Sequence, residues 1–104
     1  MITTPHYNNL SPAQAERLAH LIEELSEAQK AACKILRHGY DGSDPTKDDH
    51  CGNRVDLECE LLDVLGAIQR MAEAGDVRQW SSAEAKDAII KSNRYMHHQP
   101  KWTP

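Results

Sequence analysis

The stretch from Glu58 to Ile68, ECELLDVLGAI, is the part of the sequence that decides the fold. Its apolar residues recur three and four positions apart, which is the spacing of one face of an α-helix. The same pattern extends on both sides, so we expect a helix from about Arg54 to Ala74, with Gly75 as its stop signal. The predicted apolar face of this helix contains Val55, Leu57, Leu61, Leu62, Val64, Leu65, Ile68, Met71 and Ala72.

Two further helices are expected, one before and one after this stretch. The first opens at Ser11, where a capping-box pattern with Gln14 and a proline at the first helical position mark a start, and it stops at Gly39. The other begins near Ser81, where a second capping-box pattern ends at Glu84, and continues towards Tyr95.

Residues 39–53 lie between the first two predicted helices and are expected to form a loop, because they contain three Gly, one Pro and four Asp. The loop does not match a calcium-binding EF-hand, which needs Gly at its sixth and Glu at its twelfth position.

Composition points to one all-α domain spanning residues 1–104, with an N-terminal arm at 1–10 and an irregular tail at 96–104. Hydrophobic residues make up 39% of the chain, aromatic residues 5%, and Phe is absent. A chain of this size has a thin core, and Leu, Ile and Ala fill such a core best by packing helix on helix. We therefore expect a four-helix-type bundle that is completed by self-association, as a homodimer or homotetramer.

The charge and the cysteines narrow the possible partners and the compartment. A formal charge of −4 argues against binding a nucleic acid polymer, which needs a basic face. The sequence shows neither a signal-peptide pattern nor a transmembrane stretch, so no membrane partner is expected. Three cysteines without paired spacing indicate free thiols in a reducing cytoplasm.

Acidic residues repeat at the same place on the first two helices. Glu24 and Glu27 lie roughly 80° and 140° round from the centre of the apolar face of the first helix, and Glu60 and Asp63 have nearly the same offsets on the second. If these helices pack antiparallel, the four carboxylates converge, and a divalent cation such as Mg²⁺ or Mn²⁺ would offset their mutual repulsion. The alternative is that they are ordinary solvated side chains of two helix surfaces.

The string IEELSEAQ (residues 22–29) together with ECELLDVLGAI resembles the MazG-like family of all-α nucleotide pyrophosphohydrolases, and KILRHGYDG…NRVDLE is similar to its short, phage-type members. The family signature, Glu-Glu-x-x-Glu followed by Glu-x-x-Asp, is matched by Glu23, Glu24, Glu27, Glu60 and Asp63. The 32 residues between Glu27 and Glu60 are towards or beyond the long end of the usual spacer.

The resemblance implies hydrolysis of a (d)NTP to (d)NMP and pyrophosphate, for nucleotide-pool control or sanitation. Glu24, Glu27, Glu60 and Asp63 would hold Mg²⁺, and Glu23 or a motif carboxylate would orient or deprotonate the attacking water. A phage-encoded member would act in the host cytoplasm.

The substrate's phosphates carry more negative charge than the metal ion neutralises, so basic residues are needed to bind the rest. Relatives carry similar groups where this chain has KSNR, so Lys91, Asn93 and Arg94, followed by Tyr95, are the candidate substrate-binding residues, although a basic helix end also complements the helix dipole. Weaker candidates for binding phosphate are Lys34, Arg37 and Arg54. Candidates for contacting the base are His6, Tyr7, Tyr95, His97, His98 and Trp102. His20 lies one helical turn before Glu24, near the predicted metal site.

Two other classes of function remain open from sequence. A helical adaptor without catalysis predicts at least one damaged metal position, and none of the four is damaged. A di-iron bundle usually shows Glu-x-x-His pairs, and neither pair here ends in His. A zinc site built from His50, Cys51, Cys59, His97 and His98 lacks closed ligand spacing.

Overall fold

The computed structural model describes residues 8–42 and 52–100, and within these ranges the regular structure is helical, without strands. Three helices follow in order: α1 (Pro12–His38), α2 (Asn53–Glu73) and α3 (Ser82–Ser92). The all-α prediction is therefore confirmed. The residues predicted in the first part of the N-terminal arm, in most of the loop, and at the end of the tail lie outside the described ranges.

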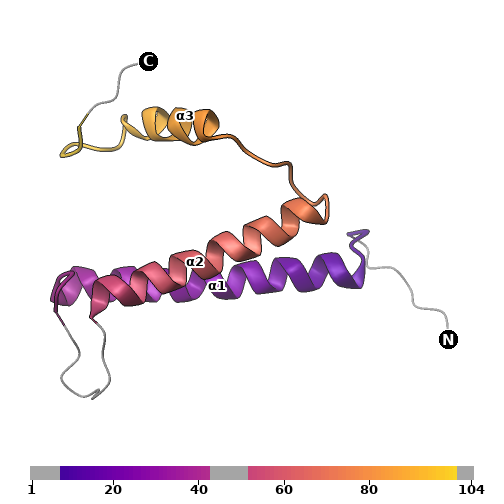
Figure 1. Cartoon of the computed structure of the whole chain (residues 1–104), viewed down its shortest axis with the longest axis horizontal. Helices are drawn as coiled ribbons and strands as arrows, with labels where there is room; N and C mark the ends of the chain where they lie inside the picture. The colour runs from indigo at the N-terminus through magenta and orange to yellow at the C-terminus, as the bar shows by residue number, and fades with distance from the viewer. Residues whose placement is uncertain (1–7, 43–51, 101–104) are drawn as a thin grey trace.

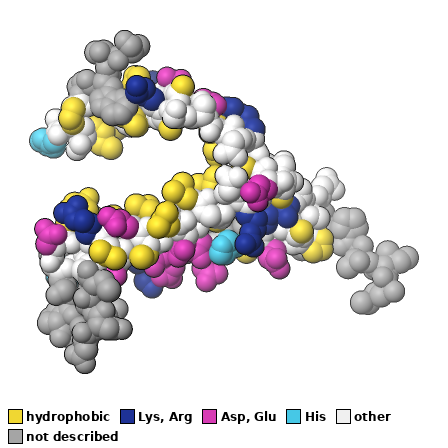
Figure 2. All heavy atoms as spheres, in the orientation of Figure 1, with side chains coloured by type: hydrophobic (Ala, Val, Ile, Leu, Met, Phe, Trp, Pro, Cys, Tyr) yellow, Lys and Arg dark blue, Asp and Glu magenta, His cyan; other side chains and the backbone are white. Residues whose placement is uncertain are grey.

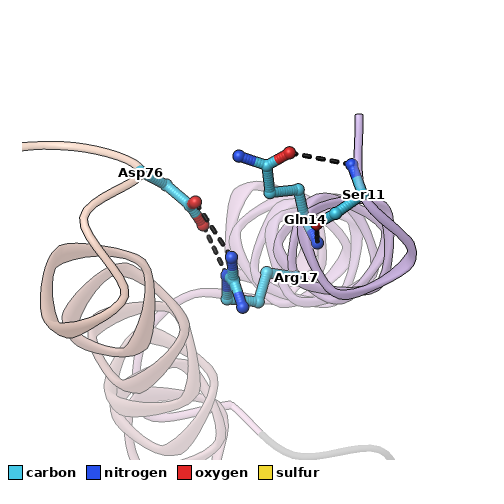
Figure 3. A network of polar contacts seen from close by, with 4 residues as sticks. All are labelled: Ser11, Gln14, Arg17 and Asp76. Carbon is cyan, nitrogen blue, oxygen red and sulfur yellow. Dashed lines mark hydrogen bonds and ion pairs between the residues drawn. The ribbon is translucent and has the colours of Figure 1, made fainter. Parts of the chain in front are cut away.

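Helix α1 begins and ends where its capping residues predict. The Ser11 hydroxyl accepts the Gln14 backbone N–H at 3.1 Å, and the Gln14 Oε1 accepts the Ser11 backbone N–H at 2.8 Å (Figure 3). At the other end Gly39 has a φ of 82°, and its N–H donates to the Ile35 carbonyl. A positive φ of this kind favours glycine, which explains why the helix ends there.

Helix α2 begins beside the end of α1, and Asn53 makes that connection. Its Nδ2 donates to the Gly39 carbonyl at 3.0 Å, while its backbone N–H donates to the Gly42 carbonyl at 3.3 Å. The Asn53 side chain is buried, and the residue is only 1% exposed. These bonds fix where α2 starts relative to α1, although Gly52 provides no side-chain cap.

Helices α1 and α2 pack side by side and antiparallel, and together they form the body of the molecule (Figure 1). An ion pair fixes the end of the pair opposite Asn53. Arg17 donates from Nε to Asp76 Oδ2 at 2.5 Å and from Nη2 to Asp76 Oδ1 at 3.0 Å (Figure 3). The hydrogen bonds from Arg17 hold the pKa of Asp76 below its ordinary value. The α1–α2 hairpin is thus anchored at both ends.

Helix α3 is formed by its own local signals and lies apart from the hairpin (Figure 1). The Ser81 hydroxyl accepts the Glu84 backbone N–H at 3.2 Å, and Glu84 also receives a hydrogen bond from Arg78. The helix ends at Ser92, earlier than the sequence predicts, and residues 93–95 form a turn. No backbone position of α3 lies close to α1 or α2.

The core within one chain is smaller than the helical pattern predicts. In the described part of the chain the buried hydrophobic residues are Val64, Ala67 and Met71, all on α2. Hydrophobic side chains also line the side of the hairpin that faces α3 (Figure 2). The large ones that remain exposed on α1, α2 and α3 are Ile22, Leu25, Leu36, Val55, Leu61, Leu62, Leu65 and Ile89.

The dimensions of the chain agree with this open packing. The radius of gyration is 18.1 Å, whereas a compact chain of this length has about 13 Å. The accessible surface is 8656 Å², compared with about 5,900 Å² for a compact monomer of this mass. None of the helices in the described ranges has the length and apolarity needed to cross a bilayer.

Candidate metal centre

Three predicted metal ligands come together in the structure: Glu24 from α1, and Glu60 and Asp63 from α2. One carboxylate oxygen from each lies within 4.8 Å of the others. We call these residues the carboxylate trio. Glu24 and Glu60 are partly buried between the helices, and Asp63 is exposed. The antiparallel packing of α1 and α2 is what brings together two motifs that lie more than thirty residues apart in the sequence.

Glu27 and Glu23 lie outside the trio. Glu27 is one turn along α1 from Glu24 and lies close enough for its charge to act on Glu60. Its Oε1 is 4.0 Å from Lys30 Nζ, a contact between two exposed side chains. Glu23 is also exposed. Three of the four predicted ligands therefore converge, and Glu27 is a neighbour that can contribute without moving the helices.

The electrostatics of the cluster are visible at Glu60. Burial raises the pKa of its carboxyl group, and the negative charges of Asp63, Glu27, Glu24 and Asp56 raise it further. A raised carboxylate pKa means that the ionised form is disfavoured where it stands. A divalent cation between the carboxylates would reverse that effect, because it would supply the opposite charge.

The donor set fits a hard divalent cation. Carboxylate oxygens are the ligands that Mg²⁺ and Mn²⁺ prefer, and Mg²⁺ usually keeps several waters beside one or a few protein ligands. His20 lies one turn before Glu24, with its Nδ1 3.8 Å from Glu24 Oε1. In that position it can orient the Glu24 carboxylate, as groups next to metal ligands commonly do.

A groove of about 790 Å³ adjoins the trio and runs between the second half of α1 and the first half of α2. Helix α1 lines it with acidic and basic residues, and α2 contributes Asn53, Asp56, Cys59 and Glu60. Sequence reasoning ranked Lys34 and Arg37 low, yet both line this groove. Their spacing from Glu27, seven and ten residues along one helix, was the available signal.

The predicted substrate-binding residues are in a different place. Lys91 is at the end of α3, and Asn93, Arg94 and Tyr95 are in the turn that follows. None of them lines the groove, and α3 does not pack on the hairpin. A single chain therefore does not bring them to the carboxylate trio.

The alternative zinc site finds no support in the described residues. Their one group of three or more possible metal donors is the carboxylate trio. Cys59 is exposed in the groove, His97 and His98 lie in the irregular segment after α3, and His50 and Cys51 fall outside the described ranges.

No match was found when the chain was compared with models of protein families, with curated proteins and with solved structures.

Proposed function

We propose that this protein is a magnesium-dependent nucleoside triphosphate pyrophosphohydrolase of the MazG-like type. The observation that supports the proposal is the convergence of Glu24, Glu60 and Asp63 from the two motif helices, with Glu27 beside them. These are the carboxylates that the sequence signature selects. Burial and the neighbouring negative charges raise the pKa of Glu60, and a bound divalent cation would oppose that shift.

The trio would hold Mg²⁺, with Glu27 as a fourth ligand or as the partner of a bound water. Bound Mg²⁺ would neutralise phosphate charge and lower the pKa of a coordinated water. The carboxylates of the chain would then have two tasks: the trio holds the cation, and another carboxylate accepts a proton from the attacking water. Glu27 and Glu23 are the candidates for the second task, because neither belongs to the trio.

The proposal includes self-association, because a single chain leaves the site and its core incomplete. The large side chains of Leu61, Leu62 and Leu65 remain exposed on one face of α2. A second copy packed on this exposed leucine face of the hairpin would cover them. It would also offer a route by which α3 of one chain reaches the trio of another.

Two rival functions predict different behaviour. A helical adaptor would fold and self-associate but hydrolyse nothing. A di-iron protein would bind iron and be coloured, and the absence of histidine from the trio argues against it.

The first experiment measures hydrolysis of ribo- and deoxyribonucleoside triphosphates in Mg²⁺, with the products separated by chromatography. We expect monophosphate and pyrophosphate from the wild type. Glu24→Ala and Asp63→Ala should lower kcat/KM by about a hundredfold or more, which is within the range for removing a main electrostatic contributor. The matched control is Glu58→Ala, an exposed carboxylate on the other side of α2.

Loss of activity in the two trio variants but not in the control supports the proposed function. Equal activity in all four proteins would overturn the role of the trio. No hydrolysis by a folded wild type that binds Mg²⁺ would favour the adaptor.

A further inference from the structure

The groove beside the trio changes charge along its length. Near the trio it is lined by Glu27 and Glu60, and further along α1 by Lys30, Lys34 and Arg37. These three basic residues, which we call the basic row, are four and then three positions apart, so they share one face of α1. The volume of about 790 Å³ is within the range of small-molecule sites.

Lys34 is the member of the row that needs an explanation. It is partly buried, but it makes no ion pair or hydrogen bond with any residue in the described ranges. Lys30, in contrast, is exposed and is 4.0 Å from Glu27. Burial of a lysine commonly involves its aliphatic stem, which leaves the ammonium group accessible. An anion in the groove would therefore be a charged partner for Lys34.

The helix dipole explains only part of the row. Arg37 is in the last turn of α1, where a positive charge interacts favourably with the dipole. Lys34 lies one turn earlier, where that effect is weak, and it lines the groove. The position of Lys34 therefore points to something that binds between the helices.

We propose that Lys34 and Arg37 bind the β- and γ-phosphates of the substrate and hold the pyrophosphate as it leaves; this inference rests on the proposed function. Lys34 is ten residues from Glu24 of the trio, or about 15 Å along the axis of α1, while Glu60 of the trio lines the same groove as Lys34. A substrate with its α-phosphate at the trio then extends its other phosphates towards the basic row, within reach of long basic side chains.

The bonds of this step balance, and the basic row adds positive charge to that of the Mg²⁺ that the trio would hold. The water oxygen bonds to the α-phosphorus, and its proton passes to a carboxylate. The bond from the α-phosphorus to the bridging oxygen breaks, and that oxygen keeps the electron pair. The extra negative charge therefore develops on the pyrophosphate, which is where Lys34 and Arg37 are placed to stabilise it.

This arrangement predicts a preference for triphosphates over diphosphates. Cleavage after the α-phosphate releases pyrophosphate from a triphosphate but only phosphate from a diphosphate. The test variants are Lys34→Gln and Arg37→Gln, with Lys34→Arg as a rescue and Arg70→Gln, an exposed residue of α2 outside the groove, as the matched control. Circular dichroism verifies that each variant keeps its helices.

Two measurements are made on each protein. One is calorimetric binding of inorganic pyrophosphate in the presence of Mg²⁺, and the other is the ratio of kcat/KM for a triphosphate to that for the matching diphosphate. Removing one charged partner should weaken pyrophosphate binding by about tenfold to a hundredfold. The triphosphate preference should fall by a similar factor, while Arg70→Gln stays near the wild type and Lys34→Arg binds pyrophosphate more tightly than Lys34→Gln does.

The two levels of inference fail in different ways. A wild type that hydrolyses triphosphates, with pyrophosphate binding and selectivity unchanged in Lys34→Gln and Arg37→Gln, overturns the role of the basic row and leaves the proposed function intact. A wild type that binds no pyrophosphate also overturns it. Pyrophosphate binding that needs Lys34, without hydrolysis of any nucleotide, supports the basic row and contradicts the proposed function.

Discussion

Glu60 is the residue whose pKa shows the effect of the neighbouring carboxylates. Besides its burial, four other carboxylates raise its pKa: Asp63 and Asp56 on α2, and Glu27 and Glu24 on α1. Its pKa is therefore raised, and in the absence of a cation its ionised form opposes folding. The same property makes it a strong ligand once a cation is present.

The pH dependence of stability follows from that shift. Since the pKa of Glu60 is higher in the folded chain than in the unfolded one, the folded metal-free protein takes up a proton first. The contribution of Glu60 to the free energy of unfolding should therefore rise as pH falls through its folded pKa, whereas the lowered pKa values of Asp76 and Glu84 act in the opposite direction as pH falls further. Saturating Mg²⁺ at neutral pH should instead stabilise the folded protein, by about 2.7 kcal/mol at a hundredfold excess over Kd.

Glu60→Gln isolates this contribution. The variant should be more stable than the wild type at neutral pH without metal, lose this pH dependence, and show little stabilisation by Mg²⁺. Urea unfolding at several pH values, with and without Mg²⁺, measures all three, and Glu58→Gln is the matched control. A Mg²⁺ effect that survives in Glu60→Gln would contradict the assignment of Glu60 as a ligand.

The motif carboxylates could be identified from the sequence, but which of them converge could not. Helical phase placed Glu24 and Glu27 on one flank, yet it could not tell which oxygens would meet, because that depends on how far α1 slides along α2. Asn53 and the Arg17–Asp76 ion pair set that register. Lys34 was ranked low because it lies near the end of the first predicted helix, beside the loop, yet it lines the groove.

At the scale of the elements, the capping residues mark where α1 and α3 begin, whereas α2 begins without a side-chain cap. Ser11 with Gln14 and Ser81 with Glu84 form both bonds of a capping box, and Gly39 ends α1 as its sequence position predicts. The end of α3 was less predictable, because residues 93–95 have no stop signal and no neighbouring helix.

Helix α3 should therefore depend on its cap more than α1 does. Ser81→Ala removes a bond to the Glu84 N–H, and losing such a cap costs about 1 kcal/mol. A short helix without packing partners has little else to hold it, so amide hydrogen exchange across α3 should become faster by roughly fivefold. Ser11→Ala is the comparison, because α1 is packed along α2 and should change mainly in its first turn.

Exchange in α3 that is slow in the wild type and unaffected by Ser81→Ala would contradict this view. It would show that α3 is packed in solution, against its own hairpin or against another copy.

At the scale of the whole molecule, the apolar pattern predicted helices correctly but overestimated how much one chain buries. Of the nine apolar positions predicted on α2, Val64 and Met71 are buried, whereas Leu61, Leu62 and Leu65 are exposed. Periodicity shows which side of a helix is apolar, but not whether the same chain covers it. The length and composition of the chain predict a thin core, and for that reason we expected self-association to complete the bundle.

Charge placed on the exposed leucine face tests that proposal. Leu62→Asp with Leu65→Asp should weaken self-association by roughly a hundredfold or more, because an unpaired carboxylate would be buried in an apolar interface. Sedimentation velocity over a range of concentrations measures it. Gln69→Asp adds one such charge at an exposed polar position of α2 and is the control for each single variant, Leu62→Asp and Leu65→Asp. A monomeric wild type would contradict self-association.

The Arg17–Asp76 ion pair joins residues that are 59 positions apart, across the end of the hairpin furthest from its loop. Chain closure is easier over short loops, so we expect the hairpin to begin to form near Asn53 and to reach this ion pair last. A contact that forms after the folding barrier affects the unfolding rate rather than the folding rate. We infer that the ion pair governs the lifetime of the folded hairpin, and so how long the two motif helices stay in register, rather than the speed with which they find it.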